Sequence, residues 1–491
     1  IITMMENQNN RFSSRFTFLL SALGIAVGTG NIWRFPRIVA SNAGDDGAGA
    51  FLVAWITFLF LWSIPLIIVE YIMGRQSRMG TVGAFSNFMG KPFAFLGGFV
   101  GVVSTAIAFF YSVIVGWNIY YFGAIIFTDL PQNNDTSWAL WSSFQNSSLP
   151  IIFHAIAMTV GGLAIFKGVS SIEKVNKILI PILLGIVLLS VFRAVSLPGS
   201  LDGIAYLFTP DWSQLRRPGI WVDALAQNAF DTGAGFGLFL TYAIYIRKKY
   251  GIVKNAFTTA IGNNLVSLIA AIMIFSTVFS ILGNEMGMQK SEILDVMKTS
   301  GPAATGLTFI WMPQLFAKMA FGKPLAILFF LGLSFAGFSS LISMLELAVR
   351  NLIDFGVQRS SAVLWIVFSS FLLGIPSAIS LEILGNQDFV WSVGLIISGI
   401  LMAIAAIKYG IDKMMNEISI ESEDDWPFPR WWPLVVRFIA PLVGFTLVAW
   451  WMIESPSFFV TCVIQWGTVL TFFYIMNSYL TKKLSNKPSS K

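Results

Sequence analysis

The sequence has almost none of the residues that usually bind transition metals or form covalent cross-links. Its 491 residues include one cysteine, Cys462, and one histidine, His154. A single cysteine cannot form an internal disulfide, and these two residues cannot build a typical His/Cys metal centre. The phosphate-loop pattern GxxxxGK[ST], the metalloprotease pattern HExxH and the nucleophile pattern GxSxG are also absent. We therefore expect neither an enzyme nor a nucleotide-driven pump.

Charge is also scarce. Only 11% of the residues are charged, 56% are hydrophobic, and the mean hydropathy is +0.73. A soluble domain does not have this composition, so we expect an all-α polytopic membrane protein whose spans each need roughly 20 apolar residues. The alternating segments of a membrane barrel are absent. Twelve predicted transmembrane helices centre near residues 26, 61, 110, 158, 184, 235, 268, 337, 369, 398, 442 and 468.

Lysine and arginine are distributed unevenly over the predicted loops. Of the 31 such residues, those expected on the side opposite the termini are only Arg193, Arg216, Arg217, Lys290, Lys298, Lys318 and Lys323. Positive residues concentrate in cytoplasmic loops, so we expect both termini in the cytoplasm. The net charge of +6 needs no nucleic-acid partner. The polar opening IITMMENQNNRFSSRF leads into a helix too long for a signal core, so we expect no cleavable signal.

Two predicted spans are interrupted near their middle. The first contains GIAVGTGNIWRFPR at residues 24–37, and the sixth contains NAFDTGAGFGLFLTYAIYIRKK at residues 228–249. Unwound backbone survives at membrane depth where it lines a cavity or holds ions, although glycines also serve close helix packing. Asn31 and Asp231 lie beside the two breaks, where polar groups are costly. The pair therefore predicts inverted repeats with a site at the midplane.

Several blocks of sequence carry a resemblance to a known family. AVGTGNIWRFP, GAFLVAW, IPLIIVEYIMGR, AFDTGAGFG and SFAGFSSLISMLE resemble the neurotransmitter:sodium symporter family, especially its bacterial amino-acid members, over residues 11–480. The resemblance implies a 5+5 inverted repeat with discontinuous helices 1 and 6. Residues 11–200 would form the first repeat, residues 201–415 the second, and residues 416–480 two peripheral helices. The expected location is the bacterial inner membrane, in contact with lipid.

The resemblance implies two sodium sites. Sodium prefers oxygen ligands, which unwound carbonyls and neutral side chains supply. One site is expected between the first and eighth helices, at the carbonyls of Gly24, Val27 and Ala336 and the hydroxyls of Ser339 and Ser340. Without the surrounding match, the simpler interpretation of these two serines is that their hydroxyls donate to carbonyls of their own helix. The other site is expected at Ala26, Asn31, Asp231 and Asn263, completed by a substrate carboxylate.

The substrate site is expected at the same breaks. Helix-end amides attract anions, so a carboxylate would meet the amides of Gly28 and Gly30 and the Tyr111 hydroxyl, while an ammonium would meet carbonyls near Ala26, Phe230 and Asp231. This chemistry suits an α-amino acid with a medium or large neutral side chain. The residues expected around that side chain are Ile107, Tyr111, Phe230, Gly233, Phe236, Ser340 and Met344.

Position 231 bears on the need for chloride. Chloride-dependent relatives have a serine there, and they bind the anion with hydroxyls from the second, sixth and seventh helices. Here the second-helix tyrosine is replaced by Trp55, while Asn263 and Ser267 remain. The resemblance therefore implies that the Asp231 carboxylate takes the place of chloride.

The resemblance also implies two gates. Arg34 and Asp388 match the outer pair, above a lid of Tyr111 and Phe230, and Asp354 matches the cytoplasmic carboxylate. The family's amino-terminal arginine and tryptophan are replaced by Asn9 and Phe12, so Arg11 or Arg15 is expected to serve at the inner gate. Of the intramembrane carboxylates Glu70 and Glu346, Glu70 is expected to cap the broken sixth helix, with proton transfer as the alternative.

Together these observations predict a sodium-coupled symporter of a neutral amino acid that works by alternating access. A symporter of another amine or osmolyte and a non-transporting amino-acid sensor are the alternatives. The sequence specifies neither the amino acid nor the oligomeric state.

Overall fold

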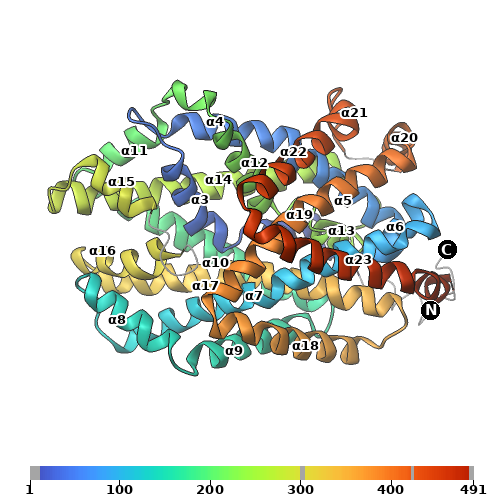
Figure 1. Cartoon of the computed structure of the whole chain (residues 1–491), viewed down its shortest axis with the longest axis horizontal. Helices are drawn as coiled ribbons and strands as arrows, with labels where there is room; N and C mark the ends of the chain where they lie inside the picture. The colour runs from blue at the N-terminus through green and yellow to red at the C-terminus, as the bar shows by residue number, and fades with distance from the viewer. Residues whose placement is uncertain (1–10, 299–304, 422–424, 486–491) are drawn as a thin grey trace.

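The computed structural model describes residues 11–298, 305–421 and 425–485, and every regular element in these ranges is a helix (Figure 1). The α-helices of the first half are α2 (Arg15–Ala26), α3 (Thr29–Ser41), α4 (Gly49–Phe58), α5 (Ile64–Ser77), α6 (Thr81–Met89), α7 (Ala94–Phe127), α8 (Asn134–Gln145), α9 (Leu149–Ile165), α10 (Val169–Val195) and α11 (Ser200–Phe208). Those of the second half are α12 (Pro218–Thr232), α13 (Leu238–Ala243), α14 (Val253–Val278), α15 (Lys290–Lys298), α16 (Met312–Lys318), α17 (Gly322–Asp354), α18 (Arg359–Ile379), α19 (Leu381–Tyr409), α20 (Ile411–Glu421), α21 (Trp432–Leu434), α22 (Ala440–Glu454) and α23 (Pro456–Ser485). Short 3-10 and π-helical turns join some of them: η1 (Leu59–Ser63), η2 (Lys91–Phe93), η3 (Trp212–Arg216), η4 (Phe279–Glu285), η6 (Leu307–Trp311) and η7 (Val435–Ile439).

Many of these helices are long and apolar enough to cross a membrane. Among the described residues nine meet that requirement, and there are up to eleven spans if each of two bent helix pairs counts as one. The two pairs are α2 with α3, bent by 47°, and α8 with α9, bent by 70°. The predicted span near residue 235 corresponds to α12 and α13, each too short to cross by itself. The all-α membrane fold is confirmed, whereas the count of twelve stays a prediction.

The first predicted break lies between α2 and α3. The Val27 amide still donates to Leu23, but Gly28 adopts an extended conformation that ends the helical path. The Asn31 side chain accepts a hydrogen bond from the Gly28 amide at 2.8 Å and so caps the start of α3. The asparagine that the sequence places in an apolar span therefore stabilises the break itself.

The second break separates α12 from α13. Gly233, Gly235 and Gly237 have φ values of 70°, 94° and 81°, a left-handed conformation that favours glycine. A Cβ atom on Gly235 would lie 2.8 Å from the Cα of Gly399 on α19. The close approach of α19 therefore also requires glycine at position 235. The fully buried Glu70 accepts hydrogen bonds from the amides of Gly235 at 2.6 Å and Leu240 at 3.2 Å. Glu70 thus caps the unwound segment.

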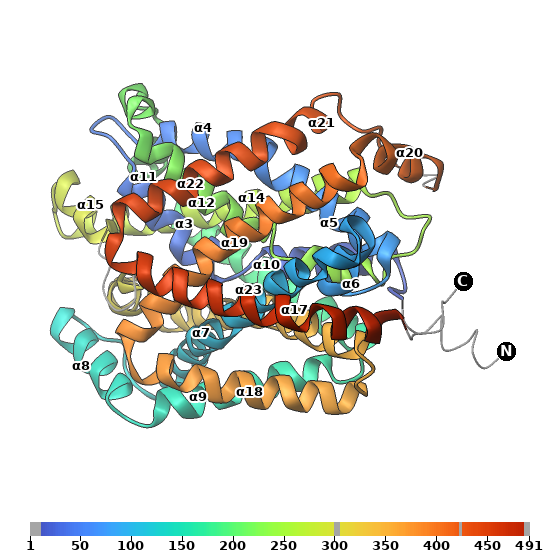
Figure 2. The ribbon, with the colours of Figure 1, turned by 45° about the vertical axis from the view of Figure 1, so that its right-hand side comes forward.

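The long helices α7 and α17 pack against each other through the middle of the molecule (Figures 1 and 2). The end of the bundle where α23 finishes also carries α6 and α20, and the opposite end carries α8, α11, α15 and α16 (Figure 1). Helices α22 and α23 lie on the outside, and only 6% of the most apolar stretch of α23 is buried. One of its buried side chains is Cys462.

Candidate functional site

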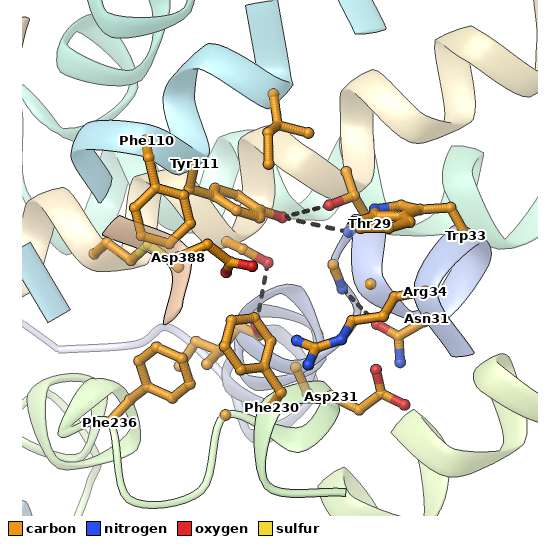
Figure 3. Close-up of a pocket in the computed structure, with 18 of the residues that line it drawn as sticks. Thr29, Asn31, Trp33, Arg34, Phe110, Tyr111, Phe230, Asp231, Phe236 and Asp388 are labelled. Atoms are coloured by element: carbon orange, nitrogen blue, oxygen red, sulfur yellow. Dashed lines mark hydrogen bonds between the residues drawn. The ribbon is translucent and has the colours of Figure 1, made fainter. Parts of the chain in front are cut away.

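A cavity lies where the two broken helices meet α7, α17 and α19 (Figure 3). Ten of the eleven predicted substrate contacts line it: Ala26, Gly28, Gly30, Tyr111, Phe230, Asp231, Gly233, Phe236, Ser340 and Met344. The eleventh, Ile107, is fully buried on α7 but lies outside the lining. The other lining residues are Ile25, Thr29, Asn31, Trp33, Arg34, Arg37, Phe110, Ile114, Leu238, Leu384 and Asp388. The breaks therefore open onto a mostly apolar cavity with a few polar groups, as ligand sites do.

The polar wall of this cavity forms around the start of α3. The Tyr111 hydroxyl accepts hydrogen bonds from the Thr29 amide at 3.3 Å and from the Thr29 hydroxyl at 3.2 Å (Figure 3). A Cβ atom on Gly28 would lie 3.0 Å from Ser340 Oγ and 3.1 Å from the Tyr111 hydroxyl. Glycine therefore lets two hydroxyls approach the backbone at a helix end that favours negative charge.

Asn31 connects this wall to α14. Because its Oδ1 accepts from the Gly28 amide, its Nδ2 is the atom that donates to Asn263 Oδ1 at 2.8 Å and to Ser267 Oγ at 2.7 Å. The bond from Gly28 fixes which atom of the Asn31 amide is the nitrogen. Exchanging the oxygen and nitrogen of Asn263 would then place two NH2 groups 2.8 Å apart, so Oδ1 of Asn263 faces Asn31.

The orientation of Asn263 brings oxygens together. Its Oδ1 lies 3.1 Å from the Ala26 carbonyl oxygen and 3.2 Å from the Asp231 carbonyl oxygen. The Asn31 amide donates to this atom, and the two carbonyl oxygens converge on the same point. Hard cations prefer neutral oxygen ligands, so the carbonyls of Ala26 and Asp231 and the side-chain oxygen of Asn263 fit sodium.

A second group of oxygens lies between α2 and α17. Ser339 Oγ donates to the Ala336 carbonyl at 2.9 Å and lies 3.4 Å from the Val27 carbonyl, while Ser340 Oγ donates to the Ile25 carbonyl at 3.2 Å. The Ala336 contact is the back-bond expected of a helical serine, whereas the other two cross from α17 to α2. These oxygens also fit a hard cation, and Gly24 directly precedes Ile25 in the last turn of α2.

The Asp231 carboxylate is buried beside the first oxygen group. It accepts hydrogen bonds from Gln227 Nε2 at 2.7 Å and from Ser267 Oγ at 3.1 Å. Trp55, the other residue considered for an anion site, instead packs on Phe35 with ring centroids 4.4 Å apart. Gln227 and Ser267 thus hold the carboxylate between α12 and α14.

The predicted outer-gate residues line the cavity without forming an ion pair. The guanidinium carbon of Arg34 lies 4.5 Å from the centroid of the Phe230 ring, and Asp388 Oδ1 accepts from Ser392 Oγ at 3.3 Å. In the described part of the chain no ion pair within 4.0 Å joins Arg34 to Asp388. The second arginine of α3, Arg37, also lines the cavity.

At the other end of the bundle, the predicted gate carboxylate is bound to its own helix and to α6. Asp354 forms an ion pair of 3.0 Å with Arg350 and accepts from the Gly80 amide at 2.5 Å. Asn9, which stands at the position of the family's amino-terminal arginine, lies outside the described residues.

The amino-terminal segment is attached nearby. The buried Phe12 donates its amide to the Tyr245 carbonyl at 3.2 Å, and Arg247 Nε donates to the Phe12 carbonyl at the same distance. Arg15 Nε donates to Asn255 Oδ1 at 2.9 Å, whereas Arg11 is exposed. The segment is therefore held against the residues after α13 and against α14.

Three polar contacts near the site were not predicted. Gln227 donates to Asp231 and orients its carboxylate. The two residues are four apart on one helix, so this contact could have been predicted from the sequence. The fully buried Glu346 is paired with Arg359 and accepts from the Tyr245 hydroxyl at 2.8 Å. The rarity of charged residues in apolar spans marks Glu346, but nothing in the sequence identifies its partner.

Comparisons with known proteins match this chain to one family of transporters. A profile of the sodium:neurotransmitter symporter family matches residues 9–147 and 143–484. A sodium-dependent transporter of Methanocaldococcus jannaschii is 31% identical over 90% of each chain, and the sodium-dependent transporter YhdH of Bacillus subtilis is 29% identical over 89% of this chain and 97% of its own. The crystal structure of MhsT in complex with L-phenylalanine superposes with a TM-score of 0.76 and 30% identity, covering 89% of this chain and 98% of that one.

Proposed function

Because the chain belongs to the sodium:neurotransmitter symporter family, a family of transporters rather than enzymes, we propose that it carries a neutral amino acid across the membrane together with sodium. The observation that carries this proposal is the chain of bonds from Gly28 through Asn31 to Asn263. It joins the amide end that suits a carboxylate to the oxygens that suit a cation. Substrate and ion would therefore bind with shared contacts.

The cavity favours an α-amino acid with an apolar side chain. The Gly30 amide and the Tyr111 hydroxyl suit the carboxylate, because the Gly28 amide is already bonded to Asn31 Oδ1. Carbonyls near Ala26 and Phe230 suit the ammonium. Phe236, Met344 and the space left by Gly233 belong to the apolar part of the lining. The L-phenylalanine complex of MhsT supports a large neutral substrate for this chain as well.

Sodium would bind at both oxygen groups. The first position has Ala26, Asn31, Asn263 and the Asp231 carbonyl, and a substrate carboxylate would complete it. The second has Gly24, Val27 and, on α17, the oxygens of Ala336, Ser339 and Ser340. In this arrangement Asp231 supplies the negative charge that makes chloride unnecessary.

The contacts at the two ends of the bundle suit alternating access. Arg34 and Asp388 are not paired, whereas the amino-terminal segment is held against α14 and the residues after α13. With both termini in the cytoplasm of a bacterial inner membrane, this would be a state closed to the cytoplasm. Pairing of Arg34 with Asp388 would then close the other side before the inner end opens.

A symporter of another amine is the second candidate, and one observation favours it. The Asp231 carboxylate lines the cavity and is able to contact an ammonium directly. Its hydrogen bonds with Gln227 and Ser267 hold it toward α14, however, which suits an ion-site role better. A non-transporting sensor of the same fold would bind substrate and sodium without moving them.

Two measurements on the purified protein separate these candidates. Thermal unfolding with each of the twenty amino acids and with common amines, in sodium or potassium chloride, identifies the ligand, since a ligand at about 100 times its Kd stabilises the native state by about 2.7 kcal/mol. Uptake of the radiolabelled ligand into proteoliposomes with an inward sodium gradient then tests transport. We expect sodium-dependent stabilisation by a neutral amino acid and its accumulation. Stabilisation without accumulation would indicate the sensor.

A further inference from the structure

One polar side chain close to the second oxygen group has no role in the proposal above. Asn176 lies on α10, in an apolar helix long enough to span the membrane, and it is 0% exposed. Its Oδ1 forms no hydrogen bond, while its amide group has the Tyr242 hydroxyl within reach. A buried amide oxygen without a donor is unfavourable, and polar residues inside membrane spans commonly mark ion or substrate positions.

The Asn176 oxygen lies beside the last turn of α2. A Cβ atom on Gly24 would lie 3.3 Å from Asn176 Oδ1 and equally far from Ile180 Cδ1. Gly24 therefore faces one oxygen and one methyl group of α10. Because Gly24 has no side chain, the Asn176 oxygen lies next to the Gly24 backbone, which belongs to the proposed ion site.

Other polar groups accompany Asn176 on this side of the site. The hydroxyl of Ser21, one turn before Gly24 on α2, is also fully buried and forms no hydrogen bond. The Tyr242 hydroxyl lies near the Asn176 amide and is 2.8 Å from Ser343 Oγ, which donates to the Ser339 carbonyl at 3.1 Å. The Tyr242–Ser343–Ser339 contacts thus link the Asn176 amide to the α17 residues of the oxygen group.

We propose that the side-chain oxygen of Asn176 is an additional ligand for a sodium ion at the second position, contributed by α10. An amide oxygen is a neutral ligand of the kind that sodium favours, and the rest of this oxygen set comes from two helices only. The inference rests on the proposed function, because it concerns an ion that the second oxygen group would hold. It also gives a reason why the Asn176 oxygen has no hydrogen-bond donor within the protein.

The test is a sodium titration of the purified, full-length protein without amino acid. Thermal unfolding is followed as sodium chloride replaces N-methyl-D-glucamine chloride at constant ionic strength, at pH 8. The first sodium position is completed by a substrate carboxylate, so this titration reports mainly on the second. Asn176→Leu should weaken the apparent sodium affinity at least threefold, because it removes the oxygen and keeps the volume. Asn176→Asp should strengthen it at least threefold through the added negative charge.

The matched control is Asn118→Leu. Asn118 lies on α7, is 1% exposed and has an unpaired Nδ2, but it does not border the cavity or Gly24. Its variant should keep the wild-type sodium affinity. An affinity unchanged in Asn176→Leu, or not strengthened in Asn176→Asp, would overturn the assignment; if the leucine variant does not fold, the aspartate variant decides. A wild-type protein without any sodium response would contradict the proposed function itself and this inference with it.

Discussion

The guanidinium of Arg34 lies over the ring of Phe230, with its central carbon 4.5 Å from the ring centroid (Figure 3). The contact joins α3, the second half of one broken helix, to α12, the first half of the other. Interactions of this kind contribute about 0.5 to 2 kcal/mol, depending on how far they are desolvated. Arg34 therefore has an alternative partner while it is separated from Asp388.

The first prediction concerns that separation. If Arg34 pairs with Asp388 only when the cavity closes, Asp388→Asn should affect a step after substrate binding. We expect the transport rate at saturating substrate to fall roughly tenfold, equivalent to about 1.4 kcal/mol in the barrier, with little change in equilibrium substrate affinity. Proteoliposome uptake and a binding assay on the same preparation measure the two quantities.

The control for this prediction is Glu382→Gln, which removes an exposed carboxylate six residues earlier on α19. It should transport like the wild type. Normal uptake by Asp388→Asn at saturating substrate would show that the pair does not act as a gate.

The second prediction follows from the amide chain through Asn31. Asn31→Ala removes the cap of Gly28 and the donor to Asn263 together, so the carboxylate end and the cation oxygens lose their connection. Ligands that share contacts affect each other reciprocally, so sodium affinity and amino-acid affinity should both fall, each by about tenfold. Ser340→Ala, at the other oxygen group, should have the same paired effect.

Asn42→Ala serves as the comparison for Asn31, because Asn42 caps the far end of the same helix and does not line the cavity. It should leave both affinities close to wild type. Sodium dependence that is the same in Asn31→Ala, Ser340→Ala and the wild type would remove the proposed ion positions.

The third prediction concerns the anion. Because the Asp231 carboxylate is held between Gln227 and Ser267, wild-type uptake should be unchanged when gluconate replaces chloride. Asp231→Ser would leave the Ser267 hydroxyl and the Asn263 amide beside a neutral side chain. We expect this variant to be stimulated by chloride, as measured by uptake over a chloride titration. An active variant that ignores chloride would contradict the prediction, as would a large loss of wild-type uptake in gluconate.

The fourth prediction concerns the stability of the second break. Glu70→Gln retains one acceptor but places an NH2 group against the amide of Gly235 or Leu240. The loss of a buried charged hydrogen bond costs about 1.5 to 3 kcal/mol, so the variant should unfold several degrees below the wild type in detergent. Glu454→Gln, at an exposed position at the end of α22, should have the wild-type Tm. Equal stability of all three proteins would show that Glu70 does not cap the break.

Much of the architecture could be predicted because its causes are local in sequence. The breaks beside Asn31 and Asp231 follow from glycines that interrupt apolar runs, and the structure places the helix ends there. Glu70 as the cap of the broken helix was also expected, since a carboxylate inside an apolar span needs several donors.

Contacts between distant segments left no comparable signal. Asp425 accepts hydrogen bonds from the amides of Ile252, Val253 and Lys254 and so caps α14 from a part of the chain about 170 residues away. Ile107 shares a helical face with Tyr111, but the cavity is bounded by α7 only from Phe110 onward, and that limit depends on how α7 crosses its neighbours. Helix crossing and loop contacts arise from packing, which periodicity does not encode.

The solitary thiol of this chain has a practical consequence for measuring its motions. Cys462 is buried on the outer helix α23, and a buried thiol reacts slowly with labelling reagents. A single substitution there would remove native thiol labelling altogether. Pairs of spin or fluorescent probes on α3 and α19, or on α2 and α10, would then report distances across each end of the bundle during turnover, in an otherwise native polypeptide.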